Sequence, residues 1–227
     1  STFYEELRGI NVLKHLINYY TNKSSLFSYA AADVGVFFKL DENSENPDFQ
    51  VHFAPGAGEY HKDGKIRPIH GITASVCQLK PFSKGSVKLE SSDYFDSPII
   101  DYGYLSDERD TEILLEGIKI VRRFFKTNIM KELNAKEIAP GEKITNNDML
   151  TNFLKSSALS VYHPVGTCKM GLDSSSVVDP ELRVHDVKNL RVADASILPE
   201  LIAGNTNAIS NVIGIKCADM ILGNQAS

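Results

Sequence analysis

Apolar residues recur at helical spacing in two long stretches of the chain. Residues 5–20 carry such a pattern, and residues 107–125 carry the clearest one. Ser106 or Asp107 can cap the second helix, acidic residues fill its first turn, and two arginines lie near its end, where they suit the helix dipole. The apolar positions are Leu7, Ile10, Leu13, Leu16 and Ile17 in the first stretch, and Leu114, Leu115, Ile118, Val121 and Phe125 in the second.

Two further helices are predicted in the second half of the chain. One covers residues 145–157, where Thr145 and Asp148 have the spacing of a capping box. The other covers residues 207–221, which are apolar through most of their length. This last helix closes the part of the chain that carries the most distinctive motifs.

Alternating apolar and polar residues predict strands in the first half of the chain. Residues 49–53 place three apolar side chains on one face and two polar ones on the other. Further strands are predicted over residues 71–79 and 85–89, with turn residues between them, and residues 26–40 lead into another strand. These strands predict an antiparallel sheet.

Two polar segments between the strands are interpreted as loops. Residues 41–48 are turn-prone and predict an exposed loop. The segment from Pro55 to Arg67 begins with a Pro-Gly-Ala-Gly turn and predicts a loop that could cover a pocket.

The totals of the sequence limit the class of protein. A chain of 227 residues suits one large domain or two small ones. A net charge of −5 leaves no basic surplus for phosphates, so we expect no nucleic-acid partner. The three cysteines show neither a zinc spacing nor a disulfide framework, which predicts no metal site and free thiols in a reducing, cytoplasmic location. We expect no transmembrane segment, because no apolar run approaches the roughly 18–20 residues that span a bilayer; peripheral membrane association is the alternative.

Several familiar catalytic motifs are missing from the sequence. There is no Walker A loop, G-x-S-x-G elbow or H-E-x-x-H pair, and no G-x-G-x-x-G fingerprint opens a helix. The chain by itself is therefore not expected to bind a dinucleotide in the Rossmann manner. Hydrolase and metalloenzyme functions have no support in these residues.

The most informative stretch runs from Val161 to Ala208. It contains, in order, Tyr162-His-Pro-Val-Gly-Thr-Cys-Lys-Met-Gly171, Val177-Val-Asp-Pro-Glu-Leu-Arg-Val-His185, Leu190-Arg-Val-Ala-Asp-Ala-Ser196 and Gly204-Asn-Thr-Asn-Ala208. These motifs resemble the C-terminal half of the glucose-methanol-choline (GMC) oxidoreductases, in the choline-dehydrogenase-like branch. Residues 79–87 and 104–110 are also similar to that branch, so the resemblance extends over nearly the whole chain from about Leu26.

The resemblance implies an α+β fold and a division of labour. Residues 1–160 would form a substrate-binding domain, an antiparallel sheet with flanking helices. Residues 161–227 would carry the active-site segment and the C-terminal strand and helix of a Rossmann-like FAD-binding domain. The N-terminal part of that domain is absent from this sequence. We therefore expect the chain to be a C-terminal portion whose FAD-binding half lies on a second polypeptide, with natural truncation as the alternative.

The resemblance also implies the chemistry, namely FAD-dependent oxidation of a small alcohol to an aldehyde. The hydroxyl proton must leave while a hydride moves from carbon to flavin N5, and a histidine suits the first task because its ordinary pKa of about 6.5 lies near neutral pH. His163 is the expected base, and Pro164 restricts its backbone. Asn205 would be its catalytic partner; it can hydrogen-bond the substrate oxygen but cannot take a proton.

Other positions follow from the same resemblance. Asp194 and Ala195 match residues that line the flavin, and Asn207 and Ala208 begin the last helix, whose positive end would face the flavin pyrimidine. Tyr162 and His52 would line the substrate pocket. Each has a simpler structural alternative: Asn205 could cap the helix, Asp194 could bond local backbone, and His52 could be an ordinary strand residue.

Two other functions compete with alcohol oxidation. The first is a lyase or a light-driven decarboxylase of the same fold, although the decarboxylase branch lacks a histidine at position 163. The second is a non-catalytic truncated module that only binds a partner. The missing nucleotide loop favours such a module, and the His163/Asn205 pair favours the enzyme.

Overall fold

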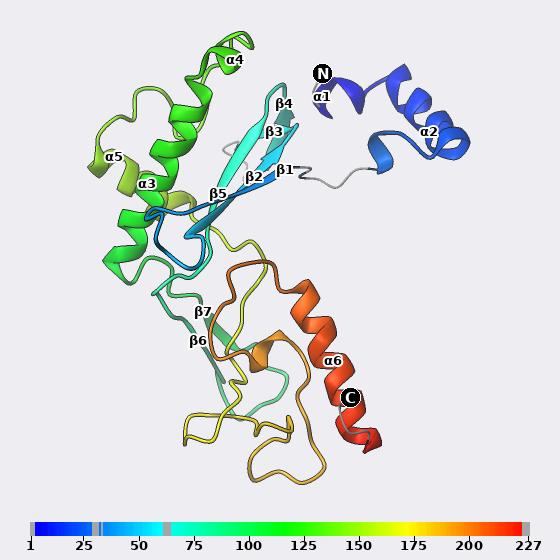
Figure 1. Ribbon diagram of the computed structural model, residues 1–227, viewed down its shortest axis with the longest axis vertical. Coiled ribbons are helices and arrows are strands. Elements are labelled where there is room, and N and C mark those ends of the chain that lie inside the picture. Colours follow the sequence, from blue (N-terminus) through cyan, green and yellow to red (C-terminus); the bar gives the residue numbers. More distant parts are fainter. Residues whose placement is uncertain (1–2, 29–31, 33, 61–64, 224–227) are drawn as a thin grey trace. The chain divides into compact units, whose positions relative to one another are not determined.

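The computed structural model describes residues 3–28, 32, 34–60 and 65–223 (Figure 1). The chain forms two compact units, each discontinuous in sequence. Unit 1 comprises Ser1–Cys77 and Leu114–Thr145, and unit 2 comprises Gln78–Ile113 and Asn146–Ser227. Compactness and function are different properties, so the functional boundary expected near residue 160 stays a prediction.

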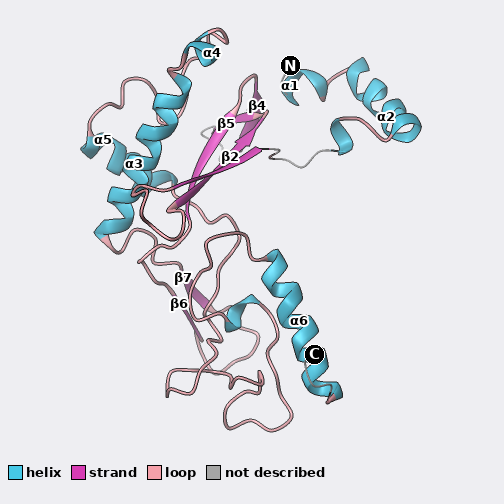
Figure 2. Cartoon of the chain, in the orientation of Figure 1, coloured by secondary structure: helices cyan, strands magenta, loops and turns pink. Residues whose placement is uncertain are grey.

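The sheet of unit 1 has three strands in the order β1-β2-β5. Figure 2 draws the strands in magenta. Their bounds are Val34–Phe38, Phe49–Ala54 and Thr73–Gln78. β1 and β2 are antiparallel, with Val34 opposite Phe53, and Phe49 and Val51 on β2 are fully buried. The alternation over residues 49–53 therefore predicted this strand and its buried face correctly. Gly117 lies on α3 (Glu108–Phe125). Because glycine has no side chain, the helix can lie close to Val76 of β5 at this position.

The N-terminal helix is shorter than predicted because it is broken near its start. The structure has α1 (Phe3–Glu6) and α2 (Ile10–Asn22), with Gly9 between them at a φ of 57°. This conformation with a positive φ costs glycine little and interrupts the helical hydrogen bonds. The short helices η1 (Leu26–Ser28) and α4 (Asn128–Lys131) complete the helical part of unit 1.

The loop predicted from Pro55 to Arg67 was wrong in part, because it contains two paired strands. β3 (Ala57–Tyr60) runs antiparallel to β4 (Ile66–Ile69), with Gly58 opposite Pro68. Most of β4 is exposed. A ribbon that buries little on either face needs no alternation of apolar residues, so the hydrophobic pattern does not reveal it.

A second correction concerns the strand predicted at residues 85–89. The structure has β6 (Ser86–Lys88), but it pairs with β7 (Ile99–Asp101) and does not join the sheet that contains β5. The intervening residues carry a Ser91–Asp96 hydrogen bond of 2.6 Å that closes the turn between the two strands. The sequence pattern indicates strands but not their partners.

The helix α5 (Asn147–Ser157) confirms the prediction for residues 145–157, but with a different cap. Asn146 is the N-cap, and its side-chain oxygen accepts a hydrogen bond of 2.8 Å from the backbone nitrogen of Met149. Asparagine is at least as good a cap as threonine, so the Thr145 capping box is not used.

The core of unit 2 joins the motif-rich segment to the last helix, α6 (Asn207–Leu222). Five buried residues form it, namely Val178, Leu182, Ile197, Ile213 and Cys217. Two of them lie on α6 and one on the short helix η2 (Ala195–Ile197). Burying several such side chains contributes about 1.5–3 kcal/mol each, which is enough to hold the start of α6 against the loops of residues 163–197.

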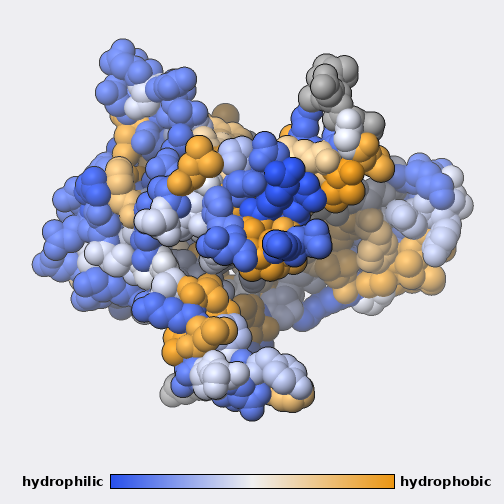
Figure 3. All heavy atoms as spheres, turned by 90° about the horizontal axis from the view of Figure 1, so that it is seen from below, coloured by the Kyte–Doolittle hydropathy of each residue, from blue (hydrophilic) through white to orange (hydrophobic). Residues whose placement is uncertain are grey.

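Much of α6 is apolar yet uncovered. Ile215 is 62% exposed and Leu222 is 72% exposed, and the apolar residues of the helix are not confined to one side. Figure 3 shows apolar side chains, drawn in orange, open on one face of the molecule. A helix whose apolar residues lie on several sides is normally buried. The exposed apolar surface of α6 is therefore typical of a helix that packs against further polypeptide. Among the described residues, no helix is long and apolar enough to cross a membrane.

Candidate active site

The structure brings His163 and Asn205 into direct contact in unit 2. The side-chain nitrogen Nδ2 of Asn205 lies 2.7 Å from Nε2 of His163. On the other side of the ring, Oγ1 of Thr206 lies 2.8 Å from Nδ1 of His163. Both partners come from the turn just before α6, more than forty residues along the chain. The imidazole is therefore held from both nitrogens by two neighbouring residues.

Backbone hydrogen bonds fix the segment that carries His163. The backbone nitrogens of Gly166 and Cys168 donate to the carbonyl oxygen of Ser196 at 3.1 and 3.0 Å, and that of Met170 donates to Ile197 at 2.8 Å. Since Ile197 belongs to the core that α6 also enters, these bonds tie the histidine and the Asn205–Thr206 turn to one framework.

The hydrogen bonds of His163 determine which nitrogen is basic. An amide nitrogen only donates, so Nε2, which faces Nδ2 of Asn205, must accept and carry the lone pair. A neutral imidazole then holds its proton on Nδ1, and Thr206 Oγ1 accepts it. The arrangement presents an unprotonated nitrogen beside an amide donor, which is the pair that a substrate hydroxyl needs.

Tyr162 precedes this histidine in an unusual conformation. Its φ is 65°, a backbone conformation that residues other than glycine rarely adopt. Its backbone nitrogen donates a hydrogen bond to Oγ of Ser160. The side chain is 89% exposed. Strained backbone of this kind tends to occur at functional sites, where it orients the next residue. The place of Tyr162 in a substrate pocket stays a prediction.

The four expected flavin contacts lie on two turns of unit 2. Oδ1 of Asp194 accepts a hydrogen bond of 2.8 Å from the backbone nitrogen of Ser196, which caps η2, where Ala195 is the first residue. Asn207 and Ala208 form the exposed first turn of α6, and Oδ1 of Asn207 accepts from the side chain of Asn211 at 3.2 Å. The capping role of Asp194, the simpler alternative, is thus present in the structure.

His52 lies on β2 of unit 1. Its backbone pairs with Gly35 of β1. Its Nε2 atom is buried, and within the described ranges it finds no hydrogen-bond partner. An unpaired buried nitrogen costs about 1–3 kcal/mol, so it normally awaits a ligand or a further group.

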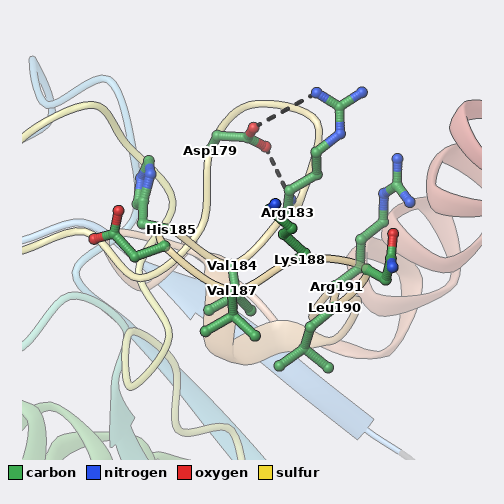
Figure 4. A pocket seen from close by; sticks show the side chains of 10 residues that line it. Asp179, Arg183, Val184, His185, Val187, Lys188, Leu190 and Arg191 are labelled. Atoms are coloured by element: carbon green, nitrogen blue, oxygen red, sulfur yellow. Dashed lines mark hydrogen bonds and ion pairs between the residues drawn. The ribbon is translucent and has the colours of Figure 1, made fainter.

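A hollow in unit 2 has a volume of about 760 Å³ and is lined by residues 179 and 183–191 (Figure 4). Neither His163 nor Asn205 lines it. Its arginines are already engaged: Arg183 lies 3.9 Å from Asp179, and Nε of Arg191 donates to the carbonyl of Glu181. We therefore assign it no ligand.

Metal and thiol chemistry find no site in the part of the chain that the structure describes. No group of three or more potential ligands gathers there. The three cysteines, all within the described residues, form no disulfide. Burial raises the pKa of the Cys77 thiol, which favours its unreactive protonated form.

Thr206 is the contact that sequence reasoning missed. Its position before an apolar helix predicts an N-cap residue. The hydroxyl of an N-cap threonine is expected to accept a hydrogen bond from a backbone N–H of the helix, not to contact a histidine. The signal available was its position between Asn205 and Asn207, at the same turn as the expected partner of His163.

Comparison with known proteins identifies relatives that match most of the chain. An alcohol dehydrogenase [acceptor] of Pseudomonas putida is 40% identical over 209 residues, which is 91% of this chain and 37% of that protein. An oxygen-dependent choline dehydrogenase of Escherichia coli is 38% identical over 194 residues, covering 86% of this chain and 35% of that protein. The chain thus spans about a third of the length of these curated relatives.

Solved structures share the fold. A pyridoxine 4-oxidase from Mesorbium loti aligns with a TM-score of 0.74 and 26% identity, over 86% of this chain and 39% of that one. A fungal aryl-alcohol oxidase aligns with a TM-score of 0.65 and 30% identity, over 80% of this chain and 28% of that one. A family model described as GMC oxidoreductase matches residues 81–214, which is more than half of the chain. The chain belongs to the GMC oxidoreductase family.

Proposed function

We propose that this chain is the C-terminal portion of an FAD-dependent enzyme that oxidises an alcohol to an aldehyde, with His163 as the base. The observation that carries the proposal is the contact between Nε2 of His163 and the amide of Asn205. This contact supports a proton acceptor and a hydrogen-bond donor acting on the same substrate hydroxyl. The relatives named as alcohol and choline dehydrogenases support the same class of reaction.

The residues at the start of α6 fit the group that this reaction needs. Thr206 makes no side-chain cap to the helix, so the first-turn N–H groups of Asn207 and Ala208 are left for an outside acceptor. Such a helix end favours negative charge, as at the pyrimidine edge of a flavin. We propose that these residues, with Asp194 and Ala195, would hold FAD. When bound, FAD supplies the acceptor for a hydride at N5.

The chain's own residues would handle the proton. The alcohol hydroxyl would enter between Asn205 and His163, where Nδ2 of Asn205 donates to its oxygen and Nε2 of His163 accepts its proton. The O–H bond would break toward Nε2 of His163 as the carbon–oxygen double bond forms, and the hydride lost from the carbon would be taken up by the acceptor that bound FAD supplies. His52 and Tyr162 are proposed as walls of the substrate pocket, and the buried unpaired Nε2 of His52 supports this role.

The nucleotide-binding loop would come from polypeptide outside these 227 residues. The coverage of about a third of each relative and the uncovered apolar surface of α6 support this proposal. We propose that a second polypeptide carries this loop. Measuring the mass of the native protein would distinguish one chain from two. A cytoplasmic location stays a prediction.

Flavin reduction tests the function. We expect the chain, assembled with its FAD-binding half, to be yellow and to lose its flavin absorbance when a primary alcohol is added without oxygen. Formation of the matching aldehyde distinguishes oxidation from lyase or light-driven chemistry. A colourless assembly with no flavin would instead support the non-catalytic module.

The role of Asn205 can be measured separately. We expect Asn205→Ala to slow flavin reduction by about 10²–10³-fold, because the substrate oxygen loses a donor while the base remains. Asn205→Asp should be at least as slow, since a carboxylate cannot donate to that oxygen. Asn43→Ala is the control, because the side chain of Asn43 is exposed and bonds Asp41 in the loop between β1 and β2. Unchanged rates in both Asn205 variants would remove Asn205 from the mechanism.

A further inference from the structure

Thr206 uses its side chain in an unexpected way for its position. It is the N-cap residue of α6, and a threonine there normally accepts a hydrogen bond from a backbone nitrogen of the first turn. The structure shows no such bond. The hydroxyl oxygen instead lies 2.8 Å from Nδ1 of His163, and the residue is only 7% exposed. The hydroxyl of Thr206 therefore contacts His163 and leaves the first-turn N–H groups of α6 without a side-chain cap.

The direction of this hydrogen bond follows from the other side of the ring. Nδ2 of Asn205 faces Nε2, so Nε2 accepts and Nδ1 carries the proton. Thr206 Oγ1 is therefore the acceptor. The same bond persists when Nε2 takes a proton, because Nδ1 keeps its hydrogen in the imidazolium form. The ring can change its charge without changing this partner.

We propose that Thr206 is a positioning residue that holds His163 in the tautomer with the lone pair on Nε2. The contacts of the ring within the described part of unit 2 go to two neutral side chains, Thr206 and Asn205. Asn205 is exposed and would turn to the substrate during the reaction, whereas Thr206 is buried and stays in place. Because a hydroxyl can donate as well as accept, the direction of the bond is set by Asn205 on the other side of the ring. Thr206 is the fixed acceptor that stabilises the proton on Nδ1 and keeps Nε2 turned toward the substrate. This inference deepens the proposed function, but the tautomer itself is a property of the chain.

The first test compares Thr206→Val with Thr206→Ser in the flavin-loaded assembly. Valine keeps the shape and removes the acceptor, so we expect flavin reduction to slow by about 10–100-fold, the usual effect of losing a partner that orients a histidine. The KM for the alcohol should change little. The loss should persist at alkaline pH, where an imidazole is neutral, because deprotonation does not choose the tautomer. Serine retains the hydroxyl and should restore most of the rate.

The second test needs no activity. In protein with ¹⁵N-labelled histidine, the chemical shifts of the ring nitrogens report which one bears the proton, and the signals absent in His163→Gln are those of His163. We expect a protonated Nδ1 and an unprotonated Nε2 in the unaltered protein and in Thr206→Ser. In Thr206→Val the two signals should move toward a mixture of tautomers.

The control is Ser210→Ala, which removes a hydroxyl that bonds only the backbone carbonyl of Thr206. It should alter neither the rate nor the shifts. Unchanged shifts and a normal rate in Thr206→Val would overturn the proposal, and so would a Thr206→Ser variant as slow as the valine. If the assembly oxidises no alcohol, the proposed function fails, while the nitrogen shifts still decide the role of Thr206.

Discussion

Replacing His163 with alanine is expected to slow the reduction of the flavin by an alcohol by about 10²–10⁴-fold, with FAD still bound. The reason is that Nε2 of His163, which lies beside the Asn205 amide, is the proposed acceptor of the hydroxyl proton. Without it the alcohol must lose its proton to water, and Asn205 cannot replace it. Rapid mixing with the alcohol in the absence of oxygen measures this step directly.

A second histidine in the same motif-rich stretch provides the matched control. Nε2 of His185 lies 3.1 Å from the carbonyl oxygen of Gly171, far along the chain from Asn205 and the turn before α6. We expect His185→Gln to reduce its flavin at the normal rate. His163→Gln, which keeps the volume of the side chain, should be as slow as the alanine variant. Reduction at a normal rate in either His163 variant, with flavin bound, would dismiss His163 as the base.

The helices were the most predictable part of the fold, because each carries its own signal. The stripe from Leu114 to Phe125 predicted α3 to within one residue of its observed start. Gly9 shows the limit, since a glycine inside a helical pattern can either continue the helix or break it. The pattern of residues 5–20 contains nothing that decides between the two.

Strand pairing was less predictable, because it depends on residues far apart in the sequence. The residues of β6 were identified as a strand, but their partner β7 was not. The β3–β4 ribbon was missed altogether, since its exposed faces impose no apolar alternation. Local patterns report burial, and these strands bury little.

The candidate site was accessible to the sequence only through its motifs. Nothing in local spacing indicates that residues 163 and 205 meet; the order of motifs suggested it, and the structure places the two side chains in contact. Thr206 escaped for a physical reason. A threonine before a helix is expected to cap the backbone N–H groups of that helix. Only the structure shows that the hydroxyl of Thr206 faces His163 instead.

Asp110 carries the second large effect, on stability. This carboxylate on α3 is 1% exposed, and it accepts hydrogen bonds from the side chain of Gln78 at 2.8 Å and from the backbone nitrogens of Phe82 and Ser83 at 2.8 and 2.7 Å. It therefore fixes residues 78–83 to the start of α3. Burial alone would raise the pKa of Asp110, but the hydrogen bonds from Ser83, Phe82 and Gln78 outweigh it, and the pKa lies below its usual value.

We expect Asp110→Asn to lower the free energy of unfolding by about 3 kcal/mol, because one oxygen becomes an NH₂ group that faces a backbone donor and the charge is lost. For a chain of this size, that corresponds to a fall in Tm of about 6–12 °C. The matched control is Asp107→Asn on the same helix. Asp107 caps α3 and pairs with Arg109 at the surface, and asparagine keeps the cap, so the shift should be much smaller.

The pH dependence gives this prediction a sign. Since the pKa of Asp110 is lower in the folded protein than in the unfolded chain, the unfolded chain binds the proton more readily. The stabilisation is complete above the ordinary carboxylate pKa of about 3.9 and is lost as the pH falls through the folded value. Urea unfolding of both proteins should therefore show a large difference at neutral pH that shrinks below about pH 4. A difference that stays constant into acid would mean that the charge of Asp110 contributes nothing and that only its shape matters.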